Sequence, residues 1–212
     1  MEKKTSELTN EFIKEHFDIK SCLKKGLINY SALARHISED LKIEKKSSKE
    51  AILVSAIRLK KRLESERSNE KRVQSLLSKS EMEIKNKMAV AVLPKTASPE
   101  SLESVQRKIR KESGRYYAIQ GSANHTIITE QANLEFIKEK FGHEIEKTQE
   151  NLVLINIKSP EEIETTTGVI AHISELFAEN NINVVELMSC WTDTIIIIDA
   201  KDLNKAIGFL KL

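Results

Sequence analysis

The chain has 212 residues, enough for one large domain or for two or three small ones. A hydrophobic fraction of 40% and a charged fraction of 31% are typical of a globular protein. No apolar run approaches the roughly 20 residues that span a bilayer, and the first residues lack the apolar core of a signal peptide. We therefore expect a cytoplasmic protein with no membrane partner. Because Cys22 and Cys190 are far apart in the sequence, neither a disulfide framework nor a metal site is expected, and no cofactor is predicted.

The charge is unevenly distributed along the chain. Lys and Arg outnumber Asp and Glu in residues 1–68, whereas the acidic residues are in excess in the remainder. A basic head on a mildly acidic body indicates a polyanionic partner for the head. The alternative is a solvated, lysine-rich surface without a partner.

Apolar residues recur at helical spacing in the first part of the chain, which predicts helices over 5–17, 18–25, 30–41 and 48–63. The last of these helices is the longest, and its outer face is basic. Short helices followed by a longer basic helix are typical of helix-turn-helix proteins, in which the final helix can enter the major groove while Lys and Arg neutralise phosphates.

The stretch LINYSALARHISEDL, followed by SSKEAILVSAIRLKKRL, resembles the small winged helix-turn-helix head of prokaryotic, notably archaeal, regulators. The resemblance implies binding of double-stranded DNA, and a wing would have to come from residues 80–87. The alternative is a helical packing module with no nucleic acid. We predict that the DNA-binding residues are Lys45, Lys46, Lys49, Arg58, Lys61 and Arg62.

After a helical connector over 69–79, the pattern of elements occurs twice. The order is β-α-β-β-α-β over 80–148, including a short strand over 143–149, and β-α-β-β-α over 149–212. We therefore predict an α+β fold in which the helical domain, residues 1–68, precedes two ferredoxin-like βαββαβ modules with helices on one face of an antiparallel sheet. The second module lacks its last strand. Because an exposed sheet edge is a liability, we expect residues 80–87 or a second subunit to cover it.

The segment GVIAHISELFAENNINVVELMS, residues 168–189, is followed by TDTIIIID. Together they resemble the ACT domain, particularly the regulatory ACT domains of aspartate kinases. The resemblance covers residues 151–210, whereas residues 88–148 are similar only in the order of their elements because SPES replaces the glycine turn. It implies binding of a small metabolite, most often an amino acid, at an interface between ACT domains. A homodimer or higher homo-oligomer through the ACT modules is therefore expected.

A loop that leads into a helix N-terminus offers unpaired N–H groups and a positive dipole end to a carboxylate. Glu186 is a candidate partner for a ligand ammonium, whereas Glu161, Glu162 and Glu164 would oppose a ligand carboxylate unless they turn outward. The ligand-binding residues that the resemblance implies are Thr167, Gly168, Val169 and Ile170 at the carboxylate, and Asn183, Val184 and Val185 on the next strand.

Motifs of catalysis do not occur in the sequence: GxSxG, HExxH, a P-loop and GxGxxG are all absent. We therefore expect a protein that is not an enzyme. The predicted function is that of an amino-acid-sensing regulator, a DNA-binding transcriptional regulator with a tandem ACT sensor. The alternative is a regulatory or dimerisation subunit that does not bind DNA and docks on an enzyme of amino-acid metabolism.

Overall fold

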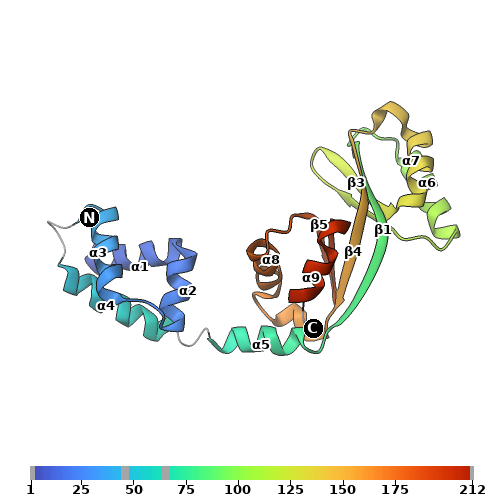
Figure 1. Ribbon diagram of the computed structural model, residues 1–212. Coiled ribbons are helices and arrows are strands. Elements are labelled where there is room, and N and C mark those ends of the chain that lie inside the picture. Colours follow the sequence, from blue (N-terminus) through green and yellow to red (C-terminus); the bar gives the residue numbers. More distant parts are fainter. Residues whose placement is uncertain (1–2, 44–47, 64–66, 211–212) are drawn as a thin grey trace. The chain divides into compact units, whose positions relative to one another are not determined.

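The computed structural model describes residues 3–43, 48–63 and 67–210. The chain divides into two compact units, Met1–Arg72 and Val73–Leu212 (Figure 1). Helix α5, Arg67–Leu77, begins in the first unit and ends in the second. Among the described residues, no helix is both long enough and apolar enough to cross a membrane.

The first unit is helical, and the four helices predicted from the apolar spacing are confirmed. Helix α4 packs against the other three, and the apolar core that joins them includes Phe12, Ile37 and Ile52. The first two helices are separate because the chain is extended at His16. The bounds of these helices are α1 Thr5–Glu15, α2 Phe17–Lys25, α3 Tyr30–Asp40 and α4 Lys49–Leu63.

The ends of these helices follow local chemistry. Gly26 ends α2 in the left-handed conformation, with φ of 76°. Asn29 caps α3 through its side chain, which accepts hydrogen bonds from the backbone N–H groups of Ser31 and Ala32 at 3.0 and 3.1 Å. In the part of this unit that the structure describes, every regular element is a helix.

The second unit contains an antiparallel sheet with helices packed against it. The strands are β1 Glu81–Pro94, β2 Tyr116–Gln120, β3 Asn124–Glu130, β4 Lys147–Lys158, β5 Val184–Cys190 and β6 Asp193–Asp199. The helices are α6 Pro99–Lys111, α7 Leu134–Phe141, α8 Val169–Glu179 and α9 Leu203–Phe209. The described residues form one six-stranded sheet with the order β2-β3-β1-β4-β6-β5. The order of helices and strands agrees with the prediction except at one place, where a single strand, β4, replaces the two strands that were expected in succession.

Strands β1 and β4 are long, and each belongs to both halves of the sheet (Figure 1). Residues 81–85 of β1 pair with residues 154–158 of β4, and residues 88–94 of β1 pair with β3. The expectation that residues 80–87 cover the open edge is therefore confirmed for residues 81–85. The wing cannot come from this segment, because it is part of the sheet. The separate strand expected over 143–149 is wrong: Gly142–Glu144 forms a 3-10 turn, and β4 begins at Lys147 and continues without a break into the first strand of the second module.

An irregularity near the middle of each long strand shifts the side-chain alternation by one position. Lys87 in β1 and Asn151 in β4 both have a φ of 56°, and the β1–β4 register shifts between Lys85 and Met88. A residue inserted into a pleated strand moves the following side chains to the opposite face. Consequently β1 contributes even-numbered residues to the helix-covered face before Lys87 and odd-numbered residues after it.

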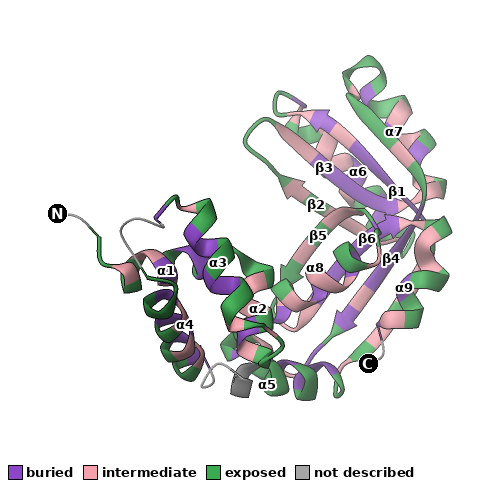
Figure 2. Ribbon diagram, turned by 60° about the vertical axis from the view of Figure 1, so that its left-hand side comes forward, coloured by how far each residue is buried: buried purple, intermediate pink, exposed green. Residues whose placement is uncertain are grey.

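Two apolar clusters lie between the sheet and its helices. One joins α6 and α7 to β1 and β3, with Ala91, Val105 and Ile137 fully buried or nearly so. The other joins α5, α8 and α9 to β4 and β6, with Ile155 and Phe177 at its centre. The buried residues accordingly concentrate on the central strands of the sheet (Figure 2).

The face of the sheet without helices is also buried, because it closes on itself. A third apolar cluster in this unit consists of strand residues, including Met88, Leu154 and Ile197, and it extends to both edge strands. Met88, Leu154 and Ile197 are almost fully buried although no helix among the described residues lies on this face, so the sheet itself covers them.

The shared strands predict how fragments of the second unit behave. A fragment of residues 73–212 should unfold cooperatively on heating, whereas residues 88–212 should not. The shorter fragment loses the partner of residues 154–158 and the apolar side chains of α5, and this loss is comparable with the roughly 5–15 kcal/mol that stabilises a typical domain. Circular dichroism during heating measures the difference. A sharp transition in the fragment of residues 88–212 would contradict this prediction, because it would show that the unit folds without α5 and the first part of β1.

Candidate functional site

The first turn of α8 carries unpaired backbone donors. Gly168 is its N-cap, with φ of 91°, and among the described residues no side chain accepts a hydrogen bond from this helix end. The first intrahelical bond at this end joins the N–H of His172 to the carbonyl of Gly168, at 2.9 Å. The N–H groups of Val169, Ile170 and Ala171 lie in the first turn, where an α-helix offers no internal acceptor. This helix end can therefore bind an anionic group.

An open pocket with a volume of about 440 Å³ lies at this helix end. Small-molecule sites have volumes of roughly 300–1,000 Å³. The polar side chains of the pocket are those of Glu164, Thr166 and Ser189. The remaining lining residues are Ile163, Gly168, Val169, Ile170, Ala171 and Trp191.

The pocket is built from two loops that hydrogen bonds hold together. Ser159, just after β4, donates its N–H to the carbonyl of Thr192, at 2.8 Å, and its hydroxyl lies 2.9 Å from that of Ser80. Thr166 is buried, and its hydroxyl donates to the carbonyl of Glu162 at 2.7 Å. The β4–α8 loop and the β5–β6 turn are thus tied to each other and to the start of β1.

Three of the implied ligand-binding residues line the pocket: Gly168, Val169 and Ile170. Thr167 is exposed beside them, although it is not among the described residues that line the pocket. The other implied segment lies elsewhere. Val184 packs on the cluster of α8 and β4, and Val185 packs on the helix-free face. Asn183 is exposed before β5.

The acidic residues near the site differ in their positions. Glu164 lines the pocket, whereas Glu161 and Glu162 are exposed and are not among its described lining residues. Glu186 pairs with Ile197, which belongs to the helix-free cluster. Burial raises the pKa of Glu186, and Lys147 lowers it. Glu186 is therefore directed toward the interior between the halves rather than toward the pocket.

Sequence reasoning did not assign Trp191 to the site. Its φ of 51° places it in the left-handed region at the turn between β5 and β6, and 63% of the residue is exposed. The pattern of a strand, a two-residue turn and a strand predicts this turn. Its position next to the N-terminus of α8 depends on the pairing of β6 with β4, which the turn itself does not determine.

The equivalent helix end in the first half of the unit is closed by its own side chains. Ser98 caps α6 by accepting a hydrogen bond from the N–H of Ser101, at 3.3 Å, and Pro99 removes another donor from the first turn. The hydroxyl of Ser98 also donates to Glu100, at 2.7 Å, which lowers the pKa of that carboxyl. The two halves of the sheet unit therefore differ at this position: the first turn of α6 is capped by a side chain, whereas the first turn of α8 is not.

The predicted DNA-binding residues lie on α4 or just before it. Lys49, Arg58, Lys61 and Arg62 are exposed, and Arg62 donates a hydrogen bond to the side-chain oxygen of Asn10 at 3.3 Å. Lys45 and Lys46 lie outside the described residues.

Comparison with known families finds one match, to the ACT domain, over residues 147–211. No curated protein sequence matches the chain.

Solved structures with similar folds include aspartate kinases and their regulatory subunits. The Clostridium acetobutylicum aspartate kinase has a TM-score of 0.52 at 12% identity, covering 61% of this chain and 33% of that enzyme. The regulatory subunits of aspartate kinase from Thermus thermophilus and Thermus flavus have TM-scores of 0.47 and 0.49, at 15% and 13% identity. They cover 59% and 61% of this chain, and 90% and 94% of those subunits. The chain thus spans about a third of the Clostridium enzyme, and the similarity is one of fold.

The backbone conformation at Gly168, the N-cap of α8, disfavours a side chain. Gly168→Ala should lower the free energy of unfolding by about 1–2 kcal/mol, because a Cβ is disfavoured in the left-handed region. Gly208→Ala is the matched control: it lies in α9, where an added Cβ meets open space, and should be neutral or stabilising by up to about 1 kcal/mol. Chemical denaturation measures both. Equal effects would contradict the proposed role of the Gly168 backbone.

Proposed function

We propose that this chain is an amino-acid-sensing regulator whose ACT domain binds the amino acid at the N-terminus of α8 and whose helical unit binds DNA. The observation that carries the proposal is the open pocket at an uncapped helix end within residues that match the ACT domain. We propose a binding role rather than a catalytic one because the family match is to the ACT domain.

The ligand carboxylate would accept hydrogen bonds from the first-turn N–H groups of Val169, Ile170 and Ala171. Two features make this helix end suitable. The left-handed Gly168 leaves the approach free of a Cβ, and charge-assisted bonds from backbone N–H groups to a carboxylate are among the stronger hydrogen bonds in proteins. Thr167 would complete the turn. Asn183, Val184 and Val185 do not line this pocket. In our proposal they contact a ligand only at a second site, which another subunit would complete.

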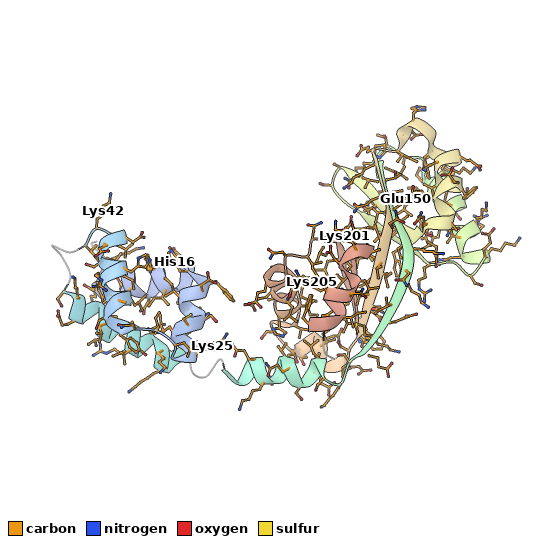
Figure 3. All side chains as sticks on the ribbon, in the orientation of Figure 1. His16, Lys25, Lys42, Glu150, Lys201 and Lys205 are labelled. Atoms are coloured by element: carbon orange, nitrogen blue, oxygen red, sulfur yellow. The ribbon has the colours of Figure 1, made fainter. Side chains whose placement is uncertain are left out.

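The DNA-binding part of the proposal rests on the outer face of α4. Arg58 and Lys61 lie three positions apart on the exposed side of α4, and Arg62 lies beside the buried residues, where it donates a hydrogen bond to Asn10. Lys25 and Lys42 are exposed on the same helical unit (Figure 3). A helix with several exposed basic residues can neutralise several phosphates at once. We include Lys45, Lys46 and Lys49, which precede or begin this helix in the sequence, in the proposed interface.

Coupling between ligand and DNA requires two arrangements of the protein. An amino acid changes DNA affinity only if it binds the two arrangements with different affinities. We propose that the arrangements are those of a homodimer, or higher homo-oligomer, assembled through the ACT modules. In such an assembly the ligand would alter the spacing of two helical units.

A second candidate function is a regulatory subunit that docks on an enzyme of amino-acid metabolism. The observation in its favour is the exposure of two large apolar side chains on the helical unit. Phe17 is 64% exposed at the start of α2, and Leu27 is 75% exposed just after its end. Apolar side chains at the surface are common at sites of protein association, although single ones also occur on ordinary surfaces.

The ligand part of the proposal is tested by isothermal titration calorimetry with the twenty amino acids. At least one should bind to the wild-type chain, and Gly168→Ala should weaken that binding at least tenfold, because an added Cβ obstructs the helix end. Gly208→Ala should leave it unchanged. Flat titrations for all twenty would overturn the sensor proposal and favour an ACT domain that serves only for assembly.

The DNA part is tested by fluorescence anisotropy with a mixed-sequence duplex at several salt concentrations. The double variant Arg58→Ala/Lys61→Ala should bind more weakly, and the slope of log affinity against log salt should decrease by about 2, since each phosphate contact contributes about 0.9. Arg110→Ala/Lys111→Ala, on an exposed part of α6, is the charge-matched control. Equal losses in both variants would indicate a general charge effect. An absence of binding by the wild-type chain at low salt would favour the docking subunit.

A further inference from the structure

We infer that the pocket selects an amino acid with an uncharged, apolar side chain, with Glu164 binding its ammonium and Trp191 covering its side chain. The inference rests on the proposed function, because it places the ligand carboxylate at the N-terminus of α8. It goes further by assigning the other two parts of the ligand to particular residues. It also replaces Glu186, the ammonium partner suggested by the sequence, with Glu164.

The charges around the pocket are of one sign. Glu164 is the one ionisable side chain among the described residues that line it. Glu161 and Glu162 belong to the same short 3-10 turn, Glu161–Thr165, and increase the negative potential there. An α-ammonium near Glu164 gains Coulomb energy and a charge-assisted hydrogen bond. A zwitterion thus finds a positive helix end for its carboxylate and a carboxylate for its ammonium.

The same charges disfavour an acidic ligand side chain. A second carboxylate, as in aspartate or glutamate, would enter a pocket whose described lining contains Glu164 and no Lys, Arg or His. The first turn of α8 offers few backbone donors, and the α-carboxylate already occupies them. The repulsion between like charges is therefore uncompensated.

The remaining wall is apolar and aromatic. Trp191 lines the pocket with Ile163 and Ile170, and Trp191 is a large side chain left mostly in water. A ligand side chain that covers the indole removes apolar surface from water on both partners, worth roughly 25 cal/mol for each Å² buried. A basic side chain would also contact the indole, but the described lining offers no second carboxylate to pair with its charge, so the loss of its hydration there is offset less well. Aliphatic and aromatic side chains of the ligand can contact Ile163, Ile170 and Trp191 without introducing a charge that lacks a partner.

The pocket residues come from two segments that a hydrogen bond joins. Glu164 and Ile163 are adjacent in the loop before α8, and Trp191 lies in the β5–β6 turn. The hydrogen bond from Ser159 to the carbonyl of Thr192, next to Trp191, fixes the second loop to the end of β4. The three ligand-facing groups therefore come from segments that are already held in position.

The experiment uses calorimetry on the full chain with leucine, phenylalanine, aspartate, glutamate and lysine, together with two leucine analogues. The analogue 4-methylpentanoate lacks the ammonium, and leucinamide lacks the carboxylate. Leucine or phenylalanine should bind at least tenfold more tightly than the charged amino acids, and each analogue should bind more weakly than leucine. Glu164→Gln should weaken leucine binding about tenfold and leave 4-methylpentanoate binding almost unchanged. Trp191→Ala should weaken leucine and phenylalanine binding.

The control variant is Glu161→Gln, which removes a charge from the same turn at an exposed residue outside the described pocket lining. Its leucine affinity should stay within about twofold of the wild type. If Glu161→Gln and Glu164→Gln weaken binding equally, the specific contact of Glu164 is overturned. If aspartate, glutamate or lysine binds most tightly, the assigned ligand class is overturned while the sensor function stands. If none of the twenty amino acids binds the wild-type chain, the proposed sensor function itself is overturned, and the inference about ligand class is overturned with it.

Discussion

The pairing of β1 with β4 is the constraint on which the second unit depends. Each strand is long enough to take part in both halves, so that residues 81–85 complete the half formed by β4, β6 and β5. The single-residue shift at Lys87 keeps the apolar side chains of β1 under the helices on both sides of it. Ser159, at the end of β4, then connects this strand pair to the loops around the pocket. The position of the site therefore follows from the ladder between two strands.

Much of this architecture could be predicted from the sequence, because helices and buried strands have strong local patterns. The apolar spacing identified the helices, and the run TDTIIIID identified β6. The resemblance of residues 168–189 to the ACT domain agrees with the match over residues 147–211. The continuity of the long strands could not be predicted, since the shift near Lys87 interrupts the alternation on which strand prediction relies. The sequence EMEIKNKMAVAV therefore indicated a weak strand followed by a strong one.

The parts of the site were predictable to different degrees. Gly168, Val169 and Ile170 follow from a local feature, the glycine before a helix, and they line the pocket. Trp191 joins them only because β6 pairs with β4, which brings a turn from a distant part of the sequence beside α8. The direction of Glu186 depends on the bulge between Val184 and Glu186, which changes the face to which later residues of β5 point. Such contacts depend on register, and register is a property of the folded sheet.

The closed helix-free face limits how this unit can meet another molecule. In the described residues 73–210, the bare side of the sheet is turned inward, with Met88, Leu154 and Ile197 almost completely shielded. No broad flat surface of the sheet is left to stack against a second copy. Among the described residues the sheet ends at β2 and β5, so these two edges and the outer surfaces of the helices are the parts of this unit left open to a second copy.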